Sequence, residues 1–211
     1  MAVRDLGLYL VTGQELSAGR TTLEVVARAV EGGVNTVQLR EKEMSARDLV
    51  ALGKEVRKIT KKHGVILIIN DRVDVAMAVE ADGVHLGQDD FPVEDARRLL
   101  GEDAIIGLSV DNAEEAVAAE KVGADYVGFG PIFKTSTKVD TGPVVGPEGI
   151  TEVREKVNIP VVAIGGINKN NAPEVLKAGA HSIALVTAIT KAEDITKETR
   201  ELVELFKLYR R

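Results

Sequence analysis

Three polar side chains alternate with other residues in the stretch VQLREKEMS, residues 37–45. Gln38, Arg40 and Lys42 occupy every second position. Side chains along a strand alternate between its two faces, so an extended backbone would put these three on one face. One amide and two cations on a single face predict an anion-binding wall, because guanidinium and ammonium groups donate charge-assisted hydrogen bonds to phosphate oxygens.

Two carboxylates, Asp71 and Asp90, each follow a short apolar run. Two hard oxygen ligands, with room left for phosphate oxygens and water, predict a Mg²⁺ site. The alternative is that Asp71 caps a helix beginning in residues 72–78 and that Asp89 or Asp90 caps the helix after Pro92. Capping and metal binding are compatible, and the sequence leaves both open.

A second group of residues is suited to phosphate. The pair Gly165-Gly166 allows a ligand to approach the backbone closely, and Thr187 adds a hydroxyl. The alternative for the glycine pair is a plain tight turn. Upstream, the long segment 131–146 carries lysines and hydroxyls, namely Lys134, Thr135, Ser136, Thr137, Lys138 and Thr141. Its length is typical of a lid or binding loop, with a solvated loop as the alternative.

Short apolar runs alternate with helical patterns along the chain, which predicts the frame that holds these residues. We expect strands at residues 7–12, 36–41, 65–71, 83–87, 105–110, 125–130, 160–166 and 182–187. Helix signals lie between them: Ser45 and Asp48 form a capping box before residues 46–64, and Asn112 and Glu115 stand in the same relation. Such alternation forces parallel strands, so we predict an α/β fold, a single compact (β/α)8 TIM barrel over residues 1–211. A doubly wound sheet is the alternative, and it would leave two or three strands unused.

The barrel would bring the candidate residues together, because active sites of such barrels lie at the carboxyl ends of the strands. Loops after the seventh and eighth strands commonly bind phosphate, which favours that role for Gly165, Gly166 and Thr187. The other candidates at this rim are Gln38, Arg40, Lys42, Asn70, Asp71, Asp90 and Ser109.

Composition excludes several classes of protein. The formal net charge of −6 argues against a general binder of nucleic acid or of anionic membranes. The chain has no cysteine, which excludes disulfides, thiolate zinc sites and a cysteine nucleophile. No signal peptide or membrane span is indicated, so we expect a cytoplasmic protein. The spacing of His63, His85 and His181 gives no metal pair or triad, and we expect all three to be structural.

Seven short segments follow one another along the chain: QLREK (38–42), IIND (68–71), HLGQDD (85–90), GLSV (107–110), GPIFKTSTK (130–138), AIGGI (163–167) and ALVTAI (184–189). In this order they resemble the thiamine-phosphate synthase family over nearly the whole chain. The resemblance implies a Mg²⁺-dependent transferase that condenses hydroxymethylpyrimidine diphosphate with hydroxyethylthiazole phosphate and releases pyrophosphate. It also implies a dissociative reaction, in which the diphosphate leaves before the thiazole nitrogen captures the pyrimidine-methyl cation.

The resemblance further implies roles for individual residues. Arg40, Lys42, Ser109 and Lys138 would act in catalysis around the leaving diphosphate, and Asp71 and Asp90 would hold Mg²⁺. The substrate-binding set would comprise Gln38, Leu39, Arg40, Glu41, Lys42, Asn70, Ser109, Thr135, Ser136, Thr137, Lys138, Gly166, Val186 and Thr187. The last three, with Thr135 and Thr137, would bind the thiazole phosphate.

Two other functions stay open. A thiazole tautomerase-like barrel resembles the synthase without an intact pyrimidine-diphosphate site, and the presence of QLREK, Asn70 and both aspartates argues against it. A non-catalytic barrel that binds a phosphate ligand would show binding without turnover. The expected partners are small-molecule substrates, and the sequence is silent on whether the chain forms a homo-oligomer.

Overall fold

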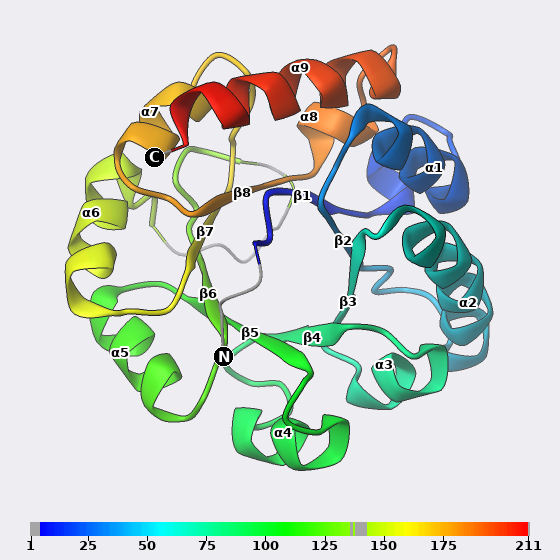
Figure 1. Ribbon diagram of the computed structural model, residues 1–211, viewed down its shortest axis with the longest axis horizontal. Helices are drawn as coiled ribbons and strands as arrows, with labels where there is room; N and C mark the ends of the chain where they lie inside the picture. The colour runs from blue at the N-terminus through cyan, green and yellow to red at the C-terminus, as the bar shows by residue number, and fades with distance from the viewer. Residues whose placement is uncertain (1–4, 136, 138–142, 211) are drawn as a thin grey trace.

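The chain folds into a closed parallel barrel. The computed structural model describes residues 5–135, 137 and 143–210. Within this part, each strand pairs with the next along the chain and the last pairs with the first (Figure 1). The strands are β1 (Leu8–Val11), β2 (Thr36–Leu39), β3 (Ile66–Asn70), β4 (Gly83–Leu86), β5 (Ile105–Val110), β6 (Tyr126–Phe129), β7 (Val161–Ile164) and β8 (Ser182–Leu185). The (β/α)8 TIM barrel prediction is confirmed, and the doubly wound alternative is wrong.

Helices surround the barrel as an outer ring (Figure 1). They are α1 (Thr22–Gly32), α2 (Ala46–His63), α3 (Val73–Val79), α4 (Val93–Leu100), α5 (Ala113–Lys121), α6 (Gly146–Lys156), α7 (Ala172–Lys177), α8 (Thr187–Thr190) and α9 (Ile195–Tyr209), with a short 3₁₀ turn, η1 (Gln14–Leu16). The last helix, α9, packs against both α1 and α7 and so covers the seam where β8 meets β1. Among the described residues, the helices include none with the length and apolar character that crossing a membrane requires.

Local sequence signals explain where the helices begin and end. The Ser45 side chain accepts a hydrogen bond from the Asp48 N–H before α2, and the helix ends at Gly64 with a φ of 67°. The Asn112 side chain accepts from the Glu115 N–H in the same way before α5. Both caps are as predicted, because a cap depends on residues three positions apart.

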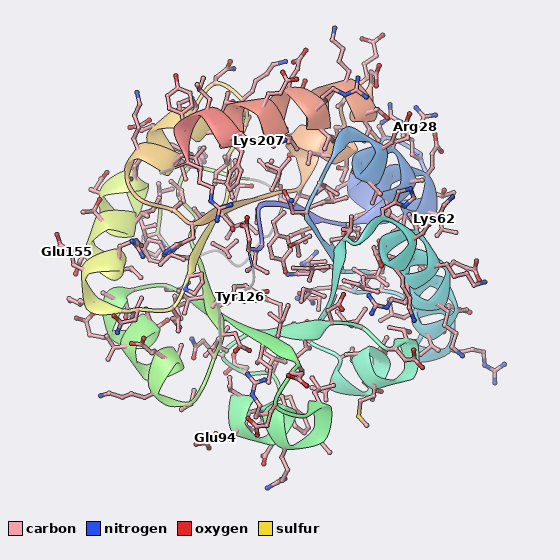
Figure 2. The ribbon with its side chains drawn as sticks, in the orientation of Figure 1. Arg28, Lys62, Glu94, Tyr126, Glu155 and Lys207 are labelled. Atoms are coloured by element: carbon pink, nitrogen blue, oxygen red, sulfur yellow. The ribbon has the colours of Figure 1, made fainter. Side chains whose placement is uncertain are left out.

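The strands bury both of their faces. One set of apolar side chains, including Leu8, Val37 and Leu67, packs against the helices. The other set fills the barrel interior, where the largest side chains are Tyr9 and Tyr126. Figure 2 labels Tyr126 near the centre of the barrel. A barrel interior is normally filled by branched apolar residues, so two buried phenol groups there need hydrogen-bond partners.

Candidate active site

A cavity of about 580 Å³ lies at the carboxyl ends of the strands. Its wall combines predicted residues from the ends of seven strands or the loops after them, which is the face where TIM barrels carry their active sites. The predicted residues that line it are Gln38, Arg40, Lys42, Asn70, Asp71, Asp90, Ser109, Thr135, Thr137, Gly166, Val186 and Thr187.

The β2 side of the cavity is a cationic wall formed by Gln38, Arg40 and Lys42. Gln38 belongs to β2, whereas Arg40 and Lys42 follow its last residue, so the alternation continues past the strand end. The Arg40 backbone N–H donates to Thr12 Oγ1 at 3.0 Å, which ties this segment to the end of β1. Among the described residues, neither Arg40 nor Lys42 forms a salt bridge. Both charges therefore remain available to an anionic ligand.

Leu39 and Glu41, predicted to bind substrate, do not line the cavity. The Leu39 side chain lies in the apolar layer between barrel and helices. The Glu41 carboxylate accepts hydrogen bonds from Thr12 Oγ1 at 2.9 Å, Thr22 Oγ1 at 2.7 Å and the Gln14 N–H at 2.9 Å. These positions follow from the alternation itself, which turns odd-numbered side chains of this stretch away from the cavity. The geometry gives both residues a supporting role.

Asp71 and Asp90 face one another at the ends of β3 and β4. Asp71 has a φ of 60°, a left-handed conformation that is uncommon for non-glycine residues and that Asp tolerates better than most. Its backbone N–H donates to the His85 carbonyl at 2.8 Å. The Asp90 carboxylate accepts from the Gly87 N–H at 2.7 Å. The N-cap residues of the helices that follow, α3 and α4, are Arg72 and Pro92, and neither helix has a side-chain cap, so the capping alternative is wrong for both carboxylates.

The electrostatics of this pair fit a cation. Burial, a hydrogen bond with Asp90 and the negative charge of Asp90 together raise the pKa of Asp71 to about 6, against the opposing charges of Lys42 and Arg40. A divalent cation bound by the two carboxylates would offset this repulsion and the cost of burial, and would favour the ionised form of Asp71. The described residues hold no group of three or more His, Cys, Asp or Glu suited to a metal. Two carboxylates alone still suit Mg²⁺, which keeps several waters and takes further ligands from substrate phosphates.

Another part of the cavity lining is a glycine-lined wall formed by Gly165, Gly166, Val186 and Thr187. The two glycines have φ values of 101° and 65°, which other residues rarely adopt, so the turn after β7 requires them. This wall combines the loops after β7 and β8 with the start of the short α8, the usual phosphate site of the fold.

Residues after β6 complete the glycine-lined wall. The Ile132 N–H donates to the Ile164 carbonyl at 2.9 Å and the Phe133 N–H to the Gly165 carbonyl at 3.0 Å, which holds the start of segment 131–146 against the end of β7. Thr135 and Thr137 consequently line the cavity beside the glycines. Ser136, Lys138 and Thr141 lie outside the described residues, so their predicted contacts and the lid interpretation stay predictions.

The cavity lining includes residues that the sequence analysis did not predict as site residues, and Tyr9, His85 and Tyr126 are the ones joined by hydrogen bonds. His85 hydrogen-bonds Tyr126 through Nδ1 and Ser109 through Nε2, each at 2.9 Å, so a structural role alone does not describe it. The available signal was strand alternation, which turns Tyr9 and Tyr126 inward between apolar neighbours that face the helices. In contrast, His63 bonds the Ile59 carbonyl and His181 contacts Arg154 and the Val161 N–H, away from the cavity.

Two walls suited to anions that line a single cavity are typical of a TIM-barrel enzyme that acts on phosphorylated small molecules. The family model described as thiamine monophosphate synthase matches residues 8–189. The chain belongs to this family of transferases in thiamine biosynthesis.

Individual relatives agree over nearly their full length. The chain is 49% identical to the thiamine-phosphate synthase of Methanosarcina barkeri over 209 residues, covering 99% of this chain and 94% of the relative. It is 50% identical to the thiamine-phosphate synthase of Chloroflexus aurantiacus, covering 94% and 91%. Among solved structures, the thiamine phosphate pyrophosphorylase of Pyrococcus furiosus has a TM-score of 0.89 and 44% identity, covering 97% of both chains.

Proposed function

We propose that this chain condenses hydroxymethylpyrimidine diphosphate with hydroxyethylthiazole phosphate to give thiamine phosphate and pyrophosphate. The observation that carries the proposal is that two walls, one cationic and one glycine-lined, line a single cavity. Two phosphorylated substrates that must meet need two anion sites at a short separation. The names of the relatives, thiamine-phosphate synthase and thiamine phosphate pyrophosphorylase, support the same reaction.

The cationic wall would bind the diphosphate and stabilise its departure. Gln38, Asn70 and Ser109 offer neutral hydrogen-bonding groups, while Arg40 and Lys42 offer charge beside them. Lys138 is a further proposed member. Stabilising the leaving group is the main task of a site whose reaction breaks a carbon–oxygen bond to diphosphate before the new bond forms. The thiazole nitrogen attacks with its lone pair and loses no proton, so the reaction needs no general base.

Asp71 and Asp90 would hold the metal, for which we propose Mg²⁺. When bound, Mg²⁺ would add charge neutralisation at the diphosphate. The two carboxylates lie beside the two cations of the wall. The carboxylates would hold the metal while Arg40 and Lys42 contact the diphosphate.

The glycine-lined wall would bind the thiazole phosphate. Thr135, Thr137 and Thr187 offer hydroxyl donors, and Gly166 and Val186 bring backbone close to the ligand. Ser136 lies between two of these threonines and is proposed with them. Phosphate held here would orient the thiazole nitrogen towards the pyrimidine methylene, which is the positioning that a two-substrate reaction requires.

Pyrophosphate release measured with both substrates and Mg²⁺ tests the proposal. We expect thiamine phosphate and pyrophosphate in equal amounts, and neither product when one substrate or Mg²⁺ is omitted. Isomerisation of the thiazole substrate alone would instead favour a tautomerase-like barrel. Saturable binding of both substrates without any product would favour a non-catalytic phosphate-binding barrel.

The remaining proposals concern the setting of the enzyme. We propose that residues 1–211 act as one catalytic domain in the cytoplasm and use small-molecule substrates, without nucleic acid or membrane partners. The sequence-based expectation leaves room for a homo-oligomer. Gel filtration with light scattering on the purified chain measures its oligomeric state directly.

A further inference from the structure

Five side chains form one continuous hydrogen-bonded chain across the barrel beneath the cavity. Gln38 Nε2 contacts the Tyr9 hydroxyl, and the Tyr9 hydroxyl contacts the Tyr126 hydroxyl, each at 2.9 Å. The Tyr126 hydroxyl contacts His85 Nδ1, and His85 Nε2 contacts Ser109 Oγ, again each at 2.9 Å. We call these residues the Gln38–Ser109 chain. It joins β2, β1, β6, β4 and β5 and ends at a hydroxyl that lines the cavity.

The amide at one end gives the chain its direction. The Gln38 NH₂ group only donates, so the Tyr9 hydroxyl accepts there. The buried Tyr9 hydroxyl proton also needs an acceptor, and we assign this role to Tyr126, the other hydroxyl that it contacts. Tyr126 in turn donates to His85 Nδ1, which must be unprotonated to accept. A neutral imidazole with bare Nδ1 carries its proton on Nε2, and this proton is donated to Ser109 Oγ. The hydroxyl proton of Ser109 is then left to point elsewhere, into the cavity.

The two phenols hold their protons firmly. Tyr9 and Tyr126 are each 1% exposed. Burial raises the pKa of Tyr9 to about 12, and burial also raises the pKa of Tyr126 well above its ordinary value. Both phenols therefore remain neutral donors at working pH, and the chain serves to orient groups rather than to conduct a proton.

Two glycines make the space that the rings of the chain occupy. A Cβ on Gly107 would lie 2.1 Å from Cζ of Tyr126, and a Cβ on Gly128 would lie 2.8 Å from Cε1 of His85. The rings of His85 and Tyr126 stack with centroids 5.4 Å apart and an interplanar angle of 29°. The sheet is thus shaped around these two rings, and their hydroxyl and nitrogen atoms have little freedom to find other partners.

We propose that Tyr9 and Tyr126 are positioning residues that act through His85 to hold Ser109 as a hydrogen-bond donor towards the substrate. This inference rests on the proposed function, in which the cationic wall binds a diphosphate. A hydroxyl that is confined to donating suits an oxygen that gains negative charge as its bond breaks. The same hydroxyl with free rotation would spend part of its time presenting a lone pair to that oxygen.

The tautomer of His85 tests the chain without any turnover. Nitrogen NMR of the ¹⁵N-histidine-labelled protein at neutral pH reports which ring nitrogen bears the proton, and the variant His85→Gln assigns the signal. We expect the proton on Nε2. A proton on Nδ1 would make His85 the donor to Tyr126 and an acceptor from Ser109, which would overturn the proposal. The NMR result does not depend on whether the protein makes thiamine phosphate. Failure of this inference can therefore be distinguished from failure of the proposed function.

Kinetics test the effect of the chain on Ser109. Tyr126→Phe keeps the buried ring and removes the hydroxyl, and we expect kcat to fall about tenfold while KM for either substrate changes less than about twofold, as for the loss of one buried hydrogen bond. Tyr209→Phe on α9, outside the cavity wall, is the matched control and should leave kcat unchanged. Tyr9→Phe provides a second break in the chain should Tyr126→Phe fail to fold.

A double-mutant cycle separates action through Ser109 from a general loss of packing. In the background Ser109→Ala, we expect Tyr126→Phe to change kcat less than about twofold, because the group that it orients is already absent. An equal loss of kcat from Tyr126→Phe in both backgrounds would show that the phenol acts independently of Ser109 and would overturn the proposal.

Discussion

Replacement of Arg40 by alanine removes one of the two cations of the wall. Arg40 is half-buried, lines the cavity and has no salt-bridge partner among the described residues, so its charge is directed at the ligand. A hydrogen bond to a charged group contributes about 1.5–3 kcal/mol. Since about 1.4 kcal/mol is a factor of ten in rate, we expect kcat/KM for the pyrimidine diphosphate to fall roughly 10- to 150-fold.

Steady-state pyrophosphate release at saturating thiazole phosphate measures the effect of Arg40→Ala. The fall should appear largely in kcat, because the negative charge on the diphosphate oxygen grows as the bond breaks. Arg40→Lys should recover part of the loss, since it restores the charge without the planar fork.

A matched charge control is Arg47→Ala, which removes an exposed arginine from the first turn of α2, outside the cavity wall. We expect this variant to stay within about twofold of the parent, as is usual for surface positions away from a site. Unchanged kinetics in Arg40→Ala, or an equal loss in Arg47→Ala, would refute the reasoning that the wall acts by direct contact.

Three further predictions address other parts of the molecule. Asp71→Asn should raise the Mg²⁺ concentration needed for half-maximal activity at least about tenfold without lowering the melting temperature, and an unchanged Mg²⁺ titration would remove Asp71 from the metal site. Thr187→Ala should raise KM for the thiazole phosphate about three- to tenfold, as for a neutral hydrogen bond, while Thr187→Ser should restore it. Burial and the charges of Arg154 and Arg210 lower the pKa of His181 from 6.5 to about 4, so the unfolded chain binds a proton first and the free energy of unfolding should fall as pH drops from about 6.5 towards 4. Urea unfolding across this range should show a smaller fall in His181→Gln, and an equal fall would contradict the assignment.

The sequence predicted those features that depend on short-range order. Alternation placed Gln38, Arg40 and Lys42 on one face, and each observed strand lies within its predicted range. Several strands end earlier than predicted, and after β3 and β7 the cause is a turn, because Asp71, Gly165 and Gly166 have positive φ values. β2, for example, ends at Leu39 rather than residue 41. Chain order together with the rule for barrel rims was then sufficient to bring the two walls together.

Contacts made by closure of the barrel were not predictable in the same way. Tyr9 and Tyr126 are separated by 117 positions, and their hydroxyls meet only because β1 and β6 stand on opposite sides of one interior. His85 was interpreted as structural because sequence spacing shows neither the phenol nor the hydroxyl that flank its ring. Leu39 and Glu41 entered the predicted site because they share a contiguous motif with true wall residues. The motif consists of consecutive residues, but only every second one of them faces the cavity.

The three hydrogen bonds of Glu41 have an electrostatic consequence. In the sequence its carboxylate stands between Arg40 and Lys42 and would cancel part of their charge. In the folded chain the hydroxyls of Thr12 and Thr22 and the Gln14 N–H donate hydrogen bonds to this carboxylate. These neutral groups stabilise its negative charge outside the cavity lining. The protein has a formal net charge of −6, so positive charge that attracts an anion is local, and Arg40 and Lys42 act within the screening distance of roughly 8 Å at physiological ionic strength. An anion that reaches the cationic wall meets these two cations, while hydrogen bonds hold the carboxylate between them in the sequence away from the cavity.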